Sequence, residues 1–174
     1  MEASLVRLQN QPAQMSGDLR SASGCLAAGA YRYLLWRRWA DAATVLFVML
    51  NPSTADAQRD DPTIRRARGL AHRWGFGAVE VANLFALRAT DPRELARARA
   101  PVGDGNDDVI AAAATRADAI VVAWGNHGAL DGRDRAVARL LAPHRLRCLG
   151  VNRDGTPRHP LYVPGRAILR PWTA

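Results

Sequence analysis

Thr44-Val45-Leu46-Phe47-Val48-Met49-Leu50 is a continuous apolar run, and it decides the fold class of this chain. A strand with one solvated face alternates apolar and polar residues, whereas an unbroken run is typical of a strand covered on both faces. The run ends at the polar segment Asn51-Pro52-Ser53-Thr54-Ala55-Asp56. The sequence therefore predicts a buried strand followed by a loop, and we expect that loop to carry the function.

Similar apolar runs recur along the chain, at residues 79–84, 119–124 and 146–151. Helical signals separate them. Asp61-Pro62 pairs an N-cap with proline at the first helical position, and Asp91-Pro92-Arg93-Glu94 adds a glutamate that completes a capping box. Further helices are expected over residues 106–116 and 131–142. The alternation predicts an α/β fold, a three-layer α/β/α sandwich around a mostly parallel four-stranded sheet.

The N-terminal part of the chain has a different pattern. Tyr31-Arg32-Tyr33-Leu34-Leu35-Trp36 alternates aromatic with other residues and predicts an antiparallel strand at the edge of the sheet. Residues 1–29 are polar, aperiodic and rich in Ala, Gly and Ser, so we expect a loosely ordered arm. Residues 30–174 are expected to form a single domain, because no linker or repeat interrupts them.

Composition excludes several classes of function. No apolar run approaches the ~20 residues that span a bilayer, and no signal peptide is recognisable, so a cytoplasmic protein without a membrane partner is expected. Cys25 and Cys148 form no Cys-x-x-Cys pair, and the four histidines have no metal-binding spacing. We therefore expect no metal and no cofactor. The protein is also expected to be a monomer.

The charge balance points to an acidic partner. The 24 basic and 16 acidic residues give a net charge of +8, and every basic residue is arginine. A guanidinium fork can bond two phosphate oxygens at once, although a basic surface can also be merely solvated. Without lysine, Schiff-base chemistry through a lysine is impossible.

The unusual polar residues of the chain follow its predicted strands. Asn51 follows the first run, Asn83 ends the second, and Gly125-Asn126-His127-Gly128 follows the third. His159-Pro160-Leu161 comes several residues after the fourth. Ligands of such sheets bind outside the carboxyl ends of the strands, so these segments are expected to form one cleft.

Each of these residues also has an ordinary structural interpretation. The Asn51 segment can be a turn, and Asn83 can be a buried amide that satisfies loop backbone. Asp61 and Asp91 are fully explained as helix caps, and this is the interpretation that we prefer for both. Asp56 fits a functional role and a further turn equally well, and His159 in isolation reads as a surface residue.

The order and spacing of these motifs make the chain similar to a bacterial family, the domain of unknown function 1643. The similarity covers roughly residues 31–164. It rests on the following segments: Asn51-Pro52-Ser53-Thr54-Ala55-Asp56, Asp61-Pro62-Thr63, Asn83-Leu84-Phe85, Ala89-Thr90-Asp91-Pro92, Ala123-Trp124-Gly125 and His159-Pro160-Leu161. That family more distantly resembles the uracil-DNA glycosylase superfamily.

The second resemblance implies roles for three positions. Asn51 before Pro52 matches the residue that orients the attacking water at the end of the first core strand. Asn83 matches the asparagine that reads the edge of the flipped base. His159 before Pro160 resembles the histidine that contacts the base oxygen where negative charge develops.

The remaining site residues are assigned around these three. Asp56 is expected to supply negative charge near the water, and Phe85 and Asn126 are added to the base-binding set. Ser53 stands where strict uracil enzymes carry a bulky aromatic side chain, so the pocket should admit a larger, C5-substituted base. DNA contacts are expected from Leu161, which lies near the position of the duplex wedge, and from the arginines Arg153, Arg158 and Arg166.

Three functions follow as hypotheses. The first is a DNA glycosylase that removes a damaged or modified pyrimidine, for example from foreign DNA, and leaves an abasic site. The second is an N-glycosidase that acts on free nucleosides or nucleotides. The third is a catalytically silent nucleic-acid-binding module, because asparagine replaces the more usual aspartate at position 51.

Overall fold

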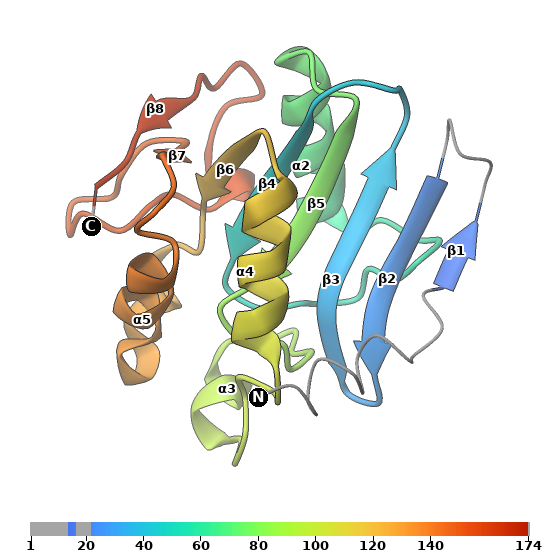
Figure 1. The fold of residues 1–174 in the computed structure, drawn as a ribbon. Helices are drawn as coiled ribbons and strands as arrows, with labels where there is room; N and C mark the ends of the chain where they lie inside the picture. The colour runs from blue at the N-terminus through green and yellow to red at the C-terminus, as the bar shows by residue number, and fades with distance from the viewer. Residues whose placement is uncertain (1–13, 17–21, 174) are drawn as a thin grey trace.

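The computed structural model describes residues 14–16 and 22–173, and these residues form one mixed β-sheet with helices on both faces (Figure 1). The strands lie in the order β1-β2-β3-β5-β4-β6-β7-β8. Their bounds are β1 Gln14–Ser16, β2 Ala22–Ala28, β3 Tyr31–Arg38, β4 Thr44–Met49, β5 Ala78–Asn83, β6 Ala119–Val122, β7 Leu146–Cys148 and β8 Arg170–Pro171.

The predicted parallel strands are present, but they form only the central part of the sheet. β5, β4, β6 and β7 pair in parallel, with Val45 opposite Val79 on one side and Ala119 on the other. β1, β2 and β3 add antiparallel strands at one end, and β8 pairs antiparallel with β7 at the other. The prediction of a four-stranded, mostly parallel sheet is therefore wrong, whereas the α/β class is confirmed.

The N-terminal part of the chain also differs from the prediction. β3 contains the expected strand, but it pairs with β5 on one side and β2 on the other, so it is internal and not an edge strand. The expectation of a loosely ordered arm is wrong for residues 22–28, which pair along β3. The arm's residues 1–13 and 17–21 lie outside the described part of the chain.

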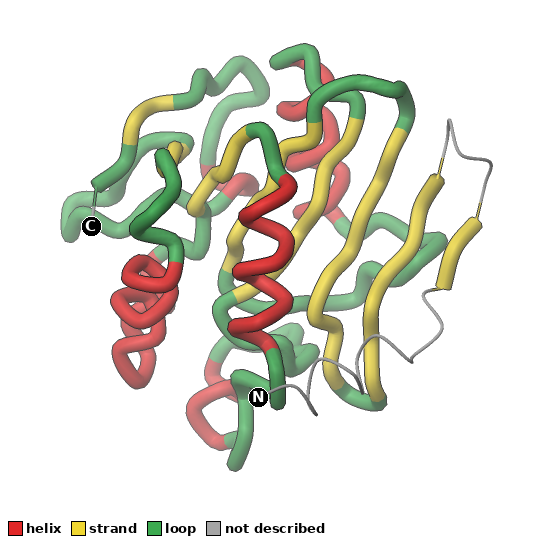
Figure 2. Tube along the Cα trace, in the orientation of Figure 1, coloured by secondary structure: helices red, strands yellow, loops and turns green. Residues whose placement is uncertain are grey.

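Helices cover the two faces of the sheet unequally (Figure 2). α3, α4 and α5 pack on one face, where their apolar residues join one buried cluster, and α2 packs on the other face with a second cluster. The helices are α2 Pro62–Arg73, α3 Arg93–Arg97, α4 Asn106–Arg116 and α5 Arg133–Leu140, with the 3-10 segments η1 Asn126–Gly132 and η2 Pro160–Tyr162. The helices expected over 106–116 and 131–142 are thus confirmed, the second in a shorter form.

The apolar run of β4 is explained by this arrangement. Successive side chains of a strand point to opposite faces, so Leu46 and Val48 join the cluster beneath α4, while Val45 and Phe47 join the cluster beneath α2. All four side chains are fully buried. Because helices cover both faces of the sheet at β4, neither face of this strand contacts solvent, and no position along it favours a polar residue.

The predicted cap of α2 is formed. Asp61 Oδ1 accepts a hydrogen bond from the Ile64 backbone N–H at 2.8 Å, and Pro62 opens α2. Before α3, Asp91 Oδ1 accepts from the Arg93 N–H and Glu94 Oε1 accepts from the Asp91 N–H. This pair of bonds differs from the predicted capping box in using the N–H of Arg93 instead of that of Glu94, and Pro92 is the residue at the N-cap position of α3.

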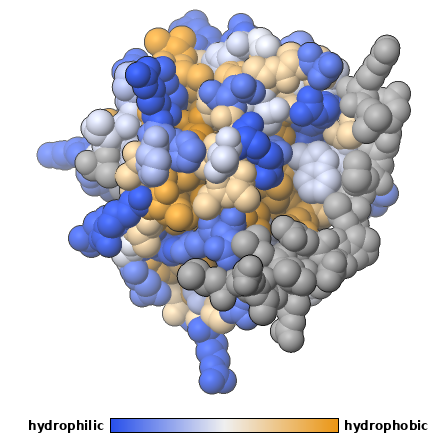
Figure 3. All heavy atoms as spheres, in the orientation of Figure 1, coloured by the Kyte–Doolittle hydropathy of each residue, from blue (hydrophilic) through white to orange (hydrophobic). Residues whose placement is uncertain are grey.

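The outer surface on the α4 side mixes hydrophilic and hydrophobic side chains without gathering either kind into one patch (Figure 3). No helix in the described residues is long and apolar enough to cross a membrane.

Candidate functional site

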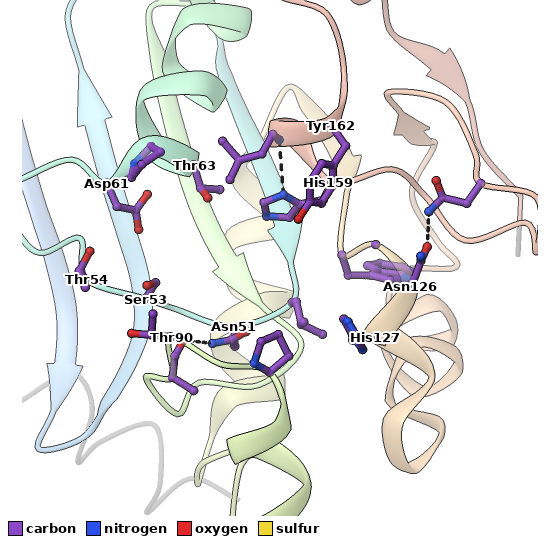
Figure 4. Close-up of a pocket in the computed structure, with 18 residues that line it drawn as sticks. Asn51, Ser53, Thr54, Asp61, Thr63, Thr90, Asn126, His127, His159 and Tyr162 are labelled. Carbon is purple, nitrogen blue, oxygen red and sulfur yellow. Dashed lines mark hydrogen bonds between the residues drawn. The ribbon is translucent and has the colours of Figure 1, made fainter.

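A cleft of about 660 Å³ opens at the carboxyl ends of β4 and β6. Its walls come from the loop after β4, the start of α2, the turn before α3, the segment after β6 and η2 (Figure 4). Polar side chains from these segments include Asn51, Ser53, Thr54, Asp61, Thr63, Thr90, Asn126, His127, Asn152, His159 and Tyr162. Chain segments far apart in sequence thus form one cleft, as the strand topology predicts.

Arginines from outside the loop between β4 and α2 hold its backbone in place. Arg32 of β3 and Arg88 both donate hydrogen bonds to the Ala55 carbonyl, at 2.7 and 2.9 Å. Arg37 of β3 pairs with Asp60 at 2.8 Å. The loop passes behind β3 (Figure 2), which puts its carbonyls within reach of these side chains. Burial lowers the pKa of Arg32 to about 10, so its guanidinium remains charged at neutral pH.

Asn51 has its amide orientation fixed by its neighbours. Its Nδ2 donates to the Pro52 carbonyl at 2.8 Å and to the Ala89 carbonyl at 2.7 Å. Both partners are acceptors only, so the amide cannot be turned around without losing both bonds. Oδ1, which accepts no hydrogen bond from the described residues, is therefore available to a water molecule or ligand in the cleft.

His159 is positioned as a neutral hydrogen-bond donor. Its Nδ1 lies 3.4 Å from the Leu161 backbone N–H and accepts from it at the start of η2. With Nδ1 as acceptor, the neutral ring carries its proton on Nε2. Burial lowers the pKa of His159 to about 4, and the negative charge of Asp61 opposes this shift only in part. The imidazole is therefore uncharged at neutral pH.

Asp61, predicted from the sequence to be only a helix cap, also lines the cleft and is a further candidate for function. Only its Oδ1 is used in capping α2, by the Ile64 N–H. The side chain is buried, lines the cleft, and raises the pKa values of both His159 and Arg32 through its charge. Of the described acidic residues, it alone lines the cleft. Figure 4 shows Asp61, Asn51 and His159 around the same space.

A family model of a protein of unknown function, DUF1643, matches residues 32–161. The chain belongs to the DUF1643 family. No curated protein and no solved structure matches the chain. The matched range contains every residue that lines the cleft except Tyr162. The resemblance to the uracil-DNA glycosylase superfamily is not tested by these comparisons and stays a prediction.

The other walls of the DUF1643 cleft combine a rigid aromatic side with small polar residues. Trp124 lines the cleft and packs edge-to-face against Trp172, with ring centroids 5.4 Å apart. Asn126 Oδ1 accepts from Asn152 Nδ2 at 2.5 Å. Ser53 lines the opposite side, as predicted for a pocket wall without a bulky aromatic residue. The sequence signal for Trp124 is its place at the end of the apolar run 119–124.

Two of the predicted base-binding residues do not line the cleft. Asn83 is buried opposite Met49 in the sheet, and its Nδ2 has no partner among the described residues. Phe85 is fully buried in the cluster beneath α4. Asn83 ends β5 and Phe85 lies two residues further on, but beyond β5 the cleft is lined only from Ala89 onward, by the turn before α3. The structure places both residues in the interior of the protein, outside the cleft lining.

Asp56 is also placed outside the cleft. Its Oδ1 accepts from the backbone N–H groups of Gln58 and Arg59, both at 2.8 Å. These two hydrogen bonds lower the pKa of the carboxyl below its usual value. The turn interpretation of Asp56 is thus the one that the geometry favours, and the negative charge in the cleft comes from Asp61.

The arginines expected to bind DNA do not line the cleft. Arg158 and Arg166 line a separate hollow of about 470 Å³ together with Arg170, and Arg158 Nε also donates to the Val151 carbonyl at 3.0 Å. Arg153 is exposed and lines neither space. Leu161 lines the cleft and is partly exposed, and its contact with DNA stays a prediction. Among the described residues, no cluster of acidic, histidine and cysteine side chains is arranged to hold a metal ion.

Proposed function

We propose that this DUF1643 protein is a monofunctional DNA glycosylase that hydrolyses the N-glycosidic bond of a modified pyrimidine and leaves an abasic site. The single observation that carries the proposal is the meeting, in one cleft, of an amide oxygen, a neutral imidazole and a carboxylate, from Asn51, His159 and Asp61. The proposal also rests on the sequence resemblance to the uracil-DNA glycosylase superfamily.

The three groups match the needs of glycosidic cleavage. The bond breaks through an oxocarbenium-like sugar and a departing base that gains negative charge. Oδ1 of Asn51 accepts a hydrogen bond from the attacking water and so orients it towards the sugar carbon. The Nε2–H of His159 donates to the base oxygen, and one such donor contributes about 2.7–4 kcal/mol of transition-state stabilisation.

Asp61 supplies the charge that an asparagine-based site otherwise lacks. An amide cannot take a proton at neutral pH, and the buried carboxylate stabilises the positive charge that develops on the sugar. In the completed reaction, water adds its hydroxyl group to the sugar carbon, and the base leaves with the remaining proton. Ser53 leaves room at the pocket wall for a substituent on the base.

The proposal is tested with DNAs that each carry a different modified pyrimidine. Released base is detected by mass spectrometry, and abasic sites are detected by strand breakage in alkali. We expect release from at least one C5-substituted pyrimidine. Rapid release of uracil together with rejection of every C5-substituted base would remove the assigned role of Ser53.

Two matched variants distinguish the contribution to activity of the Asp61 carboxylate, which lines the cleft, from that of the Asp56 carboxylate in the same loop. Asp61→Asn is expected to reduce base release by roughly 100-fold or more, because it removes the charge while keeping an oxygen. Asp56→Asn is the control, since Asp56 lies outside the cleft and is expected to keep near-normal activity. Equal losses in the two variants would contradict the role of Asp61.

The same substrates and assays distinguish two alternative functions. If free nucleosides are cleaved and outcompete duplex DNA, the protein is an N-glycosidase of small molecules. If DNA is bound tightly and no base is released from any substrate, the protein is a silent binding module, and the enzymatic proposal fails.

A further inference from the structure

A second groove runs along α2 directly beside the cleft. It has a volume of about 480 Å³, and Pro62 and Leu161 line both spaces, so the groove adjoins the cleft at these two residues. Arg65, Arg66 and Arg73 of α2 line it.

The spacing along α2 explains why these arginines share one groove. Residues four and eight positions apart lie on the same face of a helix, so Arg65, Gly69 and Arg73 form a row, with Arg66 beside it. An added Cβ at Gly69 would meet nothing within 4 Å, so the floor of the groove is open at its centre. Gly165, from the segment after η2, lines the groove beside Arg66, whose Nη1 would lie 3.1 Å from an added Cβ.

The groove arginines differ from the other arginines around α2. None of the three forms an ion pair with a carboxylate of the described residues. Arg65 donates to the Asp60 backbone carbonyl at 2.6 Å, which leaves its charge uncompensated. Arg68, by contrast, lies 3.6 Å from the Asp60 carboxylate and stacks over Trp39.

An exposed apolar ridge stands where the groove meets the cleft. Leu161 and Tyr162 of η2 have 40% and 80% of their surface exposed. A free nucleoside held in the cleft can contact this ridge, but it has no phosphate to place against the arginines beyond it. A nucleotide that belongs to a strand would continue past the ridge, and its next phosphates would enter the groove.

We infer that the α2 groove binds the phosphodiester backbone of the strand whose nucleotide occupies the cleft. The inference rests on the proposed function for its choice of ligand, and it selects polymeric nucleic acid over free nucleosides. Three guanidinium groups without a carboxylate partner in the described part of the chain suit consecutive phosphates, because a phosphate can accept two parallel hydrogen bonds from one guanidinium.

The test measures binding and does not depend on catalysis. The probe is a fluorescent oligonucleotide with a stable tetrahydrofuran abasic site, as single strand and as duplex, and anisotropy gives its affinity over a range of salt concentrations. The variant is Arg65→Gln/Arg66→Gln/Arg73→Gln. The control, Arg135→Gln/Arg139→Gln/Arg145→Gln, removes the same charge from exposed arginines on and after α5, across the sheet.

We expect the groove variant to bind roughly 10-fold or more weakly at about 50 mM salt. For this variant, the slope of log affinity against log salt concentration should be shallower by about 1.4–2.7, which corresponds to two or three lost phosphate contacts. The control should keep the slope of the wild type. Both variants should keep the thermal unfolding midpoint, because all six side chains are at least partly exposed.

Equal slopes in the two variants would overturn the inference, and so would a wild-type protein that binds no oligonucleotide. If the slopes differ as expected and no base is released from any DNA, the inference about the groove is supported and the glycosylase proposal fails. If bases are released and the slopes do not differ, the glycosylase proposal is supported and the inference about the groove fails.

Discussion

At the scale of single residues, Asn51 shows how a hydrogen-bond pattern selects one side chain over a close relative. Its Nδ2 joins the carbonyls of Pro52 and Ala89, and so ties the loop after β4 to the turn before α3. Aspartate at this position would be a better base, but it has no donor for either carbonyl. Both walls of the cleft therefore depend on the amide.

Asn51→Asp is predicted to damage the protein instead of improving its catalysis. The carboxylate would face two carbonyl oxygens that have lost their donor, which costs about 1–3 kcal/mol of unfolding free energy. Urea unfolding at neutral pH measures this loss, and the base-release assay measures activity. A variant as stable as the wild type and more active would contradict the tethering role.

His159 gives a prediction for the pH dependence of stability. Its pKa of about 4 in the folded state lies below the ordinary value of 6.5, so the unfolded chain takes up a proton first as the pH falls. This group therefore contributes full stability above about pH 6.5, and the contribution is lost progressively between pH 6.5 and pH 4.

The measurement compares wild type with His159→Asn across that window. Asparagine keeps an acceptor for the Leu161 N–H but does not titrate, so the difference in unfolding free energy between the two proteins should shrink as the pH falls. Aspartates with lowered pKa values contribute the same slope to both proteins and cancel in the difference. A difference that does not change with pH would mean that His159 is not desolvated.

At the scale of secondary-structure elements, the N-cap of α2 serves folding and the site together. Asp61→Asn keeps an oxygen for the Ile64 N–H and should change the unfolding free energy only slightly, whereas Asp61→Ala should cost about 0.5–2 kcal/mol. Base release should fall in both. Thermal unfolding and the activity assay, run on both variants, separate the two roles, and full activity in Asp61→Asn would leave capping as the only one.

The location of the site could be predicted from the sequence more completely than the residues that form it. Asn51, Ser53, Asn126, His159 and Leu161 line the cleft because the ends of parallel strands meet at one edge. The cap predicted at Asp61 is confirmed, but the cap signal is complete with one carboxylate oxygen and does not indicate that the side chain also lines the cleft, whereas Asp56 does not line it. Only the fold shows which aspartate faces the cavity.

The position of a residue at the end of a strand also does not predict whether its own side chain lines the cleft. Asn83 and Phe85 lie next to the site in the sequence, yet both are buried away from the cleft. Successive side chains of a strand point to opposite faces, and a pattern of residue types does not say which face borders the cavity. That choice depends on the lateral order of β4, β5 and β6, which the sequence does not contain.

At the scale of the whole molecule, the central strands and their helices were predictable because buried strands and capped helices leave strong local patterns. The antiparallel extension was not. β2 consists largely of small residues without alternation, and it is a strand because β3 offers it a partner along most of its length. Pairing between strands is a property of the fold, so composition alone assigned this segment to a loose arm.

Deletion of residues 1–28 tests the contribution of this extension. The deletion removes the partner of β3 and the buried Cys25, and leaves β3 with an unpaired edge beside Leu34 and Leu35. We expect a lower thermal unfolding midpoint and association of the shortened chain, because exposed edges pair with other chains. Size-exclusion chromatography beside the full chain measures this, and a monomer of unchanged stability would contradict it.

The arginines that hold the loop after β4 have a consequence for how this family can diversify. The backbone of the loop is supported from β3 and Arg88, so its shape does not depend on the side chains of Ser53 and Thr54, which make no hydrogen bond to the described residues. These two positions can be varied in a combinatorial library without disturbing the scaffold. At these two positions a new ligand preference can then be selected while the arginines that support the loop stay unchanged.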